Sequence, residues 1–177
     1  MTIQDLGSIG ELIGAVATVA TLVYLAIQIR SNTTATRSGA AQAVHESFSN
    51  WYNMLASDES LSALVAKGLR DYESLTEAER ARFVSVAMSI LLNTQDAFIK
   101  WREGSLIDEL WISWEFVIMN LVKTPGGGTV WQDRKYLFGA HFRDHVETEI
   151  MAREPHPDAK PLGAFALAEH SFRAGRD

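Results

Sequence analysis

The stretch LIGAVATVATLVYLAIQIR, residues Leu12–Arg30, decides how this chain folds. It has no charged residue before Arg30, and Gln28 is its only strongly polar side chain. The run from Leu12 to Ile29 would form a helix about 27 Å long, close to the roughly 30 Å hydrocarbon core of a bilayer. A soluble helix of this length normally repeats polar residues along one side. We therefore expect a helix that crosses a membrane.

Two alternatives stay open for this segment. A helix buried on all sides in a protein core would also be apolar all round, and the many alanines and glycines make the segment only moderately hydrophobic. A cleaved signal peptide would carry basic residues before its apolar run, whereas Met1–Glu11 has none. The pattern favours an uncleaved single-pass anchor over residues 1–30.

Basic residues near the two ends of the anchor predict its orientation. The N-terminal flank carries Asp5 and Glu11 and no lysine or arginine, whereas Arg30 and Arg37 follow the apolar run. Cytoplasmic flanks are enriched in basic residues. We expect the N-terminus outside and the chain from Arg30 onward in the cytoplasm.

Small residues recur on one side of the expected anchor. Gly10 and Gly14 form a GxxxG pair, and Thr18 continues the row one turn later. Ala17 and Thr21 form a second pair at the same spacing. Small side chains let a second helix approach closely, so these five positions are the expected helix–helix interface. The alternative is that glycine and alanine are simply common in membrane helices.

The rest of the chain shows helical periodicity and no convincing alternation of apolar and polar residues. The polar run after Arg30 has no proline and apolar residues then recur at helical spacing, so the anchor helix is expected to continue to about Ala56, with Gly39 as the candidate point for a bend. The clearest start signal is SLTEAERARF, where Thr76 and Glu79 fit a capping box, and it predicts a helix from Glu77 to about Glu103. Gly104 fits the end of that helix, and Ser105 fits the N-cap of the next one.

These elements predict an all-α fold. A transmembrane helix continues into a membrane-proximal helix and is followed by a bundle of about five helices, with residues 31–153 forming the cytoplasmic domain. The TPGGG stretch, residues 124–128, is expected to stop one helix and serve as a flexible connector rather than a phosphate-binding loop. Prolines beyond Glu154 favour a mostly irregular tail over residues 154–177.

Composition excludes several functions. The formal net charge is -6, which argues against a nucleic-acid partner because neutralising phosphates requires a basic surface. The chain has no cysteine, so disulfides, thiolate nucleophiles and cysteine-type zinc sites are excluded. No cofactor motif is present, and we expect no cofactor.

The stretches GELIGAVATVATLVYLAIQIRSNT, EGSLIDELWISWE and WQDRKYLF resemble an uncharacterised family of small bacterial membrane proteins. The similarity covers most of residues 7–150. The resemblance implies a single-pass protein of the bacterial cytoplasmic membrane with an α-helical domain. No established activity comes with it, and no catalytic residue can be carried over.

Two histidines are candidate metal ligands, and Asp144 and Glu147 are carboxylates close by in the sequence. His141 and His145 stand four residues apart on one face of an expected helix, a spacing at which two imidazoles can share a zinc ion. The glutamate that follows the first histidine in metalloproteases is replaced by Phe142, and His45–Glu46 is the only obvious source of a third ligand. The ordinary interpretation is two solvated surface histidines.

The expected function is association. We expect a membrane-anchored helical module that works as a homo-oligomer or as an accessory subunit of a larger membrane complex. Its partners would be the lipid bilayer and either itself or another membrane protein, bound through the first helix. The alternatives are a metal-dependent hydrolase that uses His141 and His145, and an oligomeric pore lined by the first helix with Glu11 at its mouth. Tryptophans on apolar helix faces are expected in the core, although an exposed aromatic surface is the rival interpretation.

Overall fold

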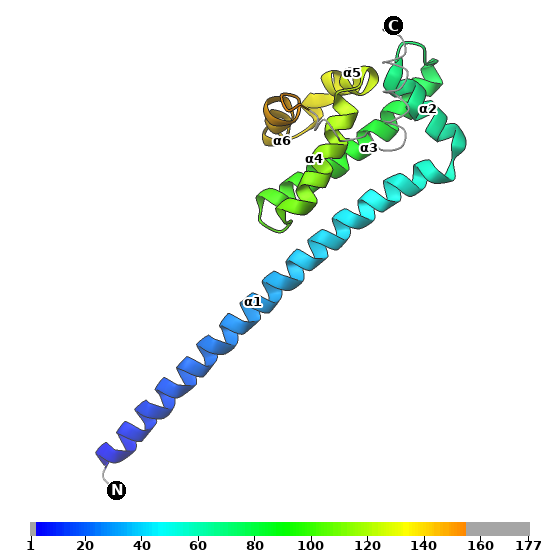
Figure 1. The fold of residues 1–177 in the computed structure, drawn as a ribbon. Coiled ribbons are helices and arrows are strands. Elements are labelled where there is room, and N and C mark those ends of the chain that lie inside the picture. Colours follow the sequence, from blue (N-terminus) through cyan, green and yellow to red (C-terminus); the bar gives the residue numbers. More distant parts are fainter. Residues whose placement is uncertain (1–2, 155–177) are drawn as a thin grey trace. The chain divides into compact units, whose positions relative to one another are not determined.

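The computed structural model describes the backbone of residues 3–154 and the side chains of residues 10, 11 and 13–154. Over this range the chain forms six α-helices and no strand, so the predicted all-α fold is confirmed. The described residues divide into two units, residues 3–39 and 40–154, along the chain drawn in Figure 1. The predicted irregular tail, apart from Glu154, lies outside the described residues.

The first helix, α1 (Ile3–Ser57), is unbroken across the polar stretch that follows Arg30, as predicted. Its last turns belong to the second unit, where Val44, Trp51 and Leu55 are buried. The indole Nε1 of Trp51 donates a 3.4 Å hydrogen bond to the carbonyl of Val86. This part of α1 is therefore an ordinary core helix of the second unit.

The next helix, α2 (Glu59–Arg70), is capped by Asp58, whose Oδ1 accepts a 2.9 Å hydrogen bond from the backbone N–H of Leu61. The guanidinium of Arg82 lies 2.7 Å from the other carboxylate oxygen of Asp58. The hydrogen bonds from Ser60 and Leu61, together with Arg82, lower the pKa of Asp58. This cap also ties the start of α2 to the helix that carries Arg82.

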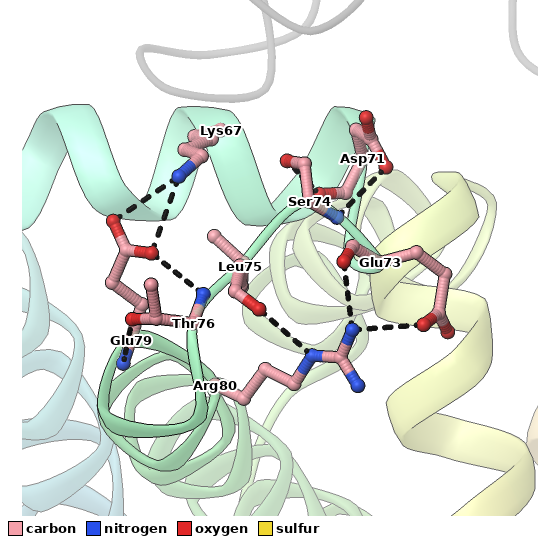
Figure 2. Close-up of polar contacts among 8 residues, drawn as sticks. All are labelled: Lys67, Asp71, Glu73, Ser74, Leu75, Thr76, Glu79 and Arg80. Carbon is pink, nitrogen blue, oxygen red and sulfur yellow. Dashed lines mark hydrogen bonds and ion pairs between the residues drawn. The ribbon is translucent and has the colours of Figure 1, made fainter.

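The helix α3 (Glu77–Arg102) begins with the predicted capping box (Figure 2). Thr76 Oγ1 accepts a 3.3 Å hydrogen bond from the N–H of Glu79, and Glu79 Oε2 accepts a 2.7 Å hydrogen bond from the N–H of Thr76. Lys67 Nζ adds a 3.1 Å ion pair from α2 to the same carboxylate. The hydrogen bond from Thr76 and the ion pair with Lys67 lower the pKa of Glu79. Because Lys67 belongs to α2, the ion pair also joins α2 to α3.

Arg80 fixes the loop between α2 and α3 (Figure 2). Its Nη2 donates hydrogen bonds to the backbone carbonyl and the carboxylate of Glu73, at 2.7 and 2.8 Å. Its Nε donates to the carbonyl of Leu75 at 3.1 Å. The guanidinium also lies 5.2 Å from the centre of the Tyr72 ring, a cation–π distance.

The predicted cap of the following helix is wrong. Gly104 adopts φ +71°, a left-handed conformation that suits glycine after a helix, as the sequence indicated. However, α4 (Asp108–Val122) begins three residues beyond Ser105, and its N-cap is Ile107, which makes no side-chain cap. Leu106 is buried, and its burial fixes the turn so that α4 begins after Ile107 rather than after Ser105.

The glycine triplet is not a flexible connector. Thr124 is an N-cap whose Oγ1 accepts a 3.0 Å hydrogen bond from the N–H of Gly127, and Pro125 is the first residue of α5 (Pro125–Arg134). A Cβ added at Gly126 would lie 1.8 Å from the carbonyl oxygen of Gly68 in α2. The glycines therefore form the first turn of α5, whose backbone packs directly against the backbone of α2. The prediction that this stretch ends the preceding helix is confirmed, because α4 ends at Val122.

The chain continues through a 3-10 turn, η1 (Lys135–Leu137), the short helix α6 (Ala140–His145) and a π-helical turn, η2 (Val146–Ile150). Lys135 Nζ lies 2.7 Å from Glu147 Oε1 and lowers the pKa of Glu147, which joins η1 to η2. Gly139 donates a 2.8 Å hydrogen bond to the side-chain oxygen of Gln95 in α3.

One buried cluster joins the helices of the second unit. The helix α3 lies against α4, and α5 packs against α2 and α4. Core packing of the tryptophans is confirmed for the four that are buried, which are Trp51, Trp111, Trp114 and Trp131. Trp101 is half-buried against the same cluster.

Candidate functional site

The first candidate is the apolar part of α1. The helix is long and apolar enough to cross a membrane, with a mean hydropathy of 1.7 over its most apolar 18 residues. None of that window is buried by the rest of the described chain. The large apolar side chains from Ile13 to Ile29 are 46–68% exposed. Length and composition alone identify this helix as a candidate span, and the core helix of a soluble protein can share both.

The polar side chains in this stretch are bonded within the helix. Thr18 Oγ1 donates a 2.9 Å hydrogen bond to the carbonyl of Gly14, and Thr21 Oγ1 donates a 2.8 Å bond to the carbonyl of Ala17. Gln28 Nε2 donates a 2.9 Å bond to the hydroxyl of Tyr24. Lipid cannot supply hydrogen bonds, so these internal partners lower the cost of placing the helix in a bilayer.

The predicted interface residues lie open on the helix. Nothing comes within 4 Å of a Cβ built on Gly10 or Gly14, and Ala17, Thr18 and Thr21 are exposed. Because Thr18 and Thr21 point their hydroxyls at carbonyls one turn earlier, they present mainly methyl groups to a neighbouring helix. The face is shaped for close approach, and the association itself stays a prediction.

The second candidate is the histidine pair. His145 is mostly buried, and its Nε2 lies 2.9 Å from Glu115 Oε1. His141 is exposed and lines a separate shallow pocket of about 450 Å³ with Arg102 and Phe142. Among the residues that the structure describes, no three His, Asp or Glu side chains are grouped to hold a metal ion. The structure therefore adds no support to the predicted metal site.

The residue that joins His145 to the rest of the fold is Glu115, which the sequence analysis did not single out. Glu115 is 6% exposed and is one of two buried polar residues in the described chain, the other being Thr94. Its Oε2 lies 2.6 Å from Arg153 Nη1, and its Oε1 lies 2.9 Å from His145. One buried carboxylate thus pairs with two groups from the end of the described chain, as buried charges require.

Aromatic rings enclose His145 on several sides. The ring centres of Phe98, Trp101 and Trp111 lie 5.1, 5.9 and 5.6 Å from the imidazole. Trp101 stacks on Trp111 at 5.3 Å with an interplanar angle of 15°, and Trp101 Nε1 donates a 2.8 Å hydrogen bond to Asp108. His145 is therefore a structural part of an aromatic cluster between α3 and α4.

A signal for Glu115 was present in the sequence. It stands inside the run LWISWEFVIMNLV, four residues after Trp111, and so lies on the side of the helix that the apolar period assigns to the core. A carboxylate on a core-facing position requires a cationic partner. The partners were not predictable, because His145 and Arg153 are 30 and 38 residues away in sequence.

A cavity of about 290 Å³ adjoins this carboxylate. Its lining comes from α4, from η2 and from the residues that follow η2, and its charged members are Glu115, Arg153 and Glu154. The apolar lining residues are Ile112, Phe116, Met119 and Ile150. The cavity is thus a small, largely apolar recess whose lining includes two carboxylates, and the chain's own guanidinium lies against that of Glu115.

Comparison with known proteins gives no match among protein-family models, curated proteins or solved structures. The functional conclusion therefore depends on the physical chemistry of the residues described above. Of the two candidates predicted from the sequence, the exposed apolar helix has the stronger physical support.

Proposed function

We propose that this protein is a membrane-anchored helical module that acts by association through its first helix. The observation that carries the proposal is the uncovered apolar surface of α1 between Ile13 and Ile29. Leaving that much apolar surface in water is costly, at about 25 cal/mol for each Å². A bilayer is the solvent that removes this cost for a single helix of this length.

The proposed location is the bacterial cytoplasmic membrane, with the N-terminus outside and the helical domain in the cytoplasm. The support for this orientation is the pair of basic residues, Arg30 and Arg37, after the apolar run and their absence before it. The bacterial assignment comes from the sequence resemblance described above.

The support for association is the shape of one side of α1. Membrane helices associate through close packing, because lipid already satisfies their apolar surface. Gly10, Gly14 and Ala17 leave room for a second backbone, and the neighbouring threonine hydroxyls are already bonded. The partner is a second copy of this helix or a helix of another membrane protein.

Anchoring and orientation are tested together with single cysteines, which the natural chain lacks. Ser8→Cys and Ser38→Cys flank the apolar run and should both float with membranes in a density gradient after a high-salt wash. A maleimide that cannot cross the bilayer should label Ser8→Cys in intact spheroplasts and should label Ser38→Cys only after lysis. Protein that stays in the aqueous fraction as a folded species would overturn the proposal.

Association is tested with a matched pair of substitutions. Gly14→Leu adds bulk to the small-residue face, whereas Ala15→Leu adds similar bulk about 100° further round the helix. The detergent-solubilised wild type should migrate as an oligomer or with a co-purifying partner in light-scattering chromatography. Gly14→Leu should shift it to monomer, and Ala15→Leu should not. A strictly monomeric wild type with no partner would contradict the association.

The hydrolase and pore alternatives gain no specific support from the described residues. Elemental analysis of the purified chain addresses the first, because stoichiometric zinc, iron or manganese would favour a metal enzyme that uses His141 and His145. Ion flux into liposomes, lost on Glu11→Gln, addresses the second. Either positive result would replace association as the leading function.

A further inference from the structure

We propose that Glu115 and the apolar cavity beside it form a guanidinium-binding site, which Arg153 occupies from within the chain. The proposal concerns the second unit and does not depend on membrane anchoring. Glu115 is 94% buried, yet it lies at the wall of a cavity that opens to the surface. A buried carboxylate requires a cationic partner, so the site stays occupied.

The occupant is held at its charged end. Arg153 Nη1 lies 2.6 Å from Glu115 Oε2, a short charge-assisted contact, while the side chain as a whole is 51% exposed. The other carboxylate oxygen, Oε1, is bound by His145, whose ring is enclosed by the aromatic cluster. His145 is thus the fixed partner of Glu115, and Arg153 is the exchangeable one.

The backbone around Arg153 is held independently of its side chain. The N–H of Arg153 donates a 3.2 Å hydrogen bond to the carbonyl of Glu149, and Lys123 Nζ donates to the carbonyl of Arg153. The guanidinium can therefore leave Glu115 by rotation of its own side chain, without release of the segment that follows η2. Exchange at this site is a local event.

The chemistry of the site selects a guanidinium attached to an apolar group. Glu115 accepts the planar cation, and Ile112, Phe116 and Ile150 offer an apolar wall beside it. Two sources share this chemistry, which are a small alkylguanidine and an arginine side chain of a partner protein next to an apolar residue. Both would compete with Arg153 for the same carboxylate oxygen.

The test uses the full chain in detergent and follows its melting temperature, Tm, with millimolar methylguanidinium. Arg153→Ala empties the site and should lower Tm by about 5 °C in the absence of ligand. Methylguanidinium should then restore part of the loss, with an apparent Kd at least about tenfold lower than for the wild type, since the internal ligand no longer competes. A blocked Leu-Arg-Leu peptide, used in parallel, shows which source binds more tightly.

Two controls separate this site from general effects of the reagent. Neutral N-methylurea at equal concentration should give no rescue, because it has the same shape without the charge. Arg134→Ala removes an exposed arginine that has no carboxylate partner among residues 3–154, and methylguanidinium should leave its Tm unchanged.

Arg153→Lys keeps a cation on the same segment and should show intermediate affinity, so the proposal stays testable if the alanine variant is poorly folded. Equal Tm responses to methylguanidinium and N-methylurea in Arg153→Ala and Arg153→Lys would overturn the proposal. An equal rescue of Arg134→Ala would overturn it as well.

Discussion

Gly126→Ala should separate two helices that now touch backbone to backbone. The added Cβ would lie 1.8 Å from the carbonyl oxygen of Gly68, whereas an ordinary contact of this kind is 3.4 Å or more. Both groups belong to helical backbone, so no flexible side chain can move aside. The helices α2 and α5 would have to part by roughly 1.5 Å, which disturbs the contacts of buried Leu69 and Trp131.

The expected loss is about 3 kcal/mol of unfolding free energy, at the upper end of the usual cost of overpacking a core. That corresponds to a fall in Tm of roughly 10 °C for a domain of this size. Urea unfolding followed by tryptophan fluorescence is the suitable assay. All five tryptophans lie between residues 51 and 131, so their emission reports on the second unit alone.

Gly139→Ala is the matched control. Its Cβ would lie 3.7 Å from the side-chain oxygen of Gln95, an ordinary contact, and its φ of -58° suits any residue. It should stay within about 1 kcal/mol of the wild type. A Gly126→Ala protein as stable as Gly139→Ala would refute the close approach of α2 and α5.

Three further outcomes are expected in the same assay. Gly68→Ala should also lower stability clearly, because its Cβ would lie 2.5 Å from Cδ2 and 2.7 Å from Cγ of buried Phe83, and rotation of the ring about its own axis leaves Cγ in place; a stability equal to that of Gly139→Ala would contradict this reason. Thr76→Ala should lower stability by about 1 kcal/mol through loss of the N-cap, and Thr76→Ser should restore most of it. Glu79→Gln should reduce the loss of unfolding free energy at acid pH. The folded state lowers the pKa of Glu79, so the stability that this carboxylate contributes is present above its unfolded pKa and is lost as pH falls through its folded pKa. If the unfolding free energies of the wild type and Glu79→Gln fall equally as the pH is lowered, protonation of this carboxylate is not linked to folding.

Local signals in the sequence predicted the helices well. The bounds of α3 followed from the capping box at Thr76 and from Gly104, because a cap and a left-handed glycine act within one turn of the chain. The continuation of α1 to Ser57 followed from the absence of proline and from its apolar spacing. Such features depend on neighbours in sequence and can be read without a structure.

Features that depend on distant neighbours were missed. The triplet Gly126–Gly128 has the composition of a loop, and only the backbone of Gly68, far away in sequence, makes these glycines necessary inside a helix. The partners of Glu115 likewise come from a different segment. The metal site predicted at His141 and His145 stays a prediction, since His145 lies 2.9 Å from Glu115 while His141 is exposed.

The stacked indoles of Trp101 and Trp111 have a practical consequence. They sit on successive helices, α3 and α4, 5.3 Å apart, and Asp108, which accepts a hydrogen bond from Trp101, is the first residue of α4. Electronic transitions of two rings so close are coupled, and the coupling disappears when the rings part. The near-ultraviolet circular dichroism of the unlabelled protein therefore reports whether Trp101 and Trp111 remain stacked. The spectrum of Trp101→Phe, which lacks the pair, is the reference.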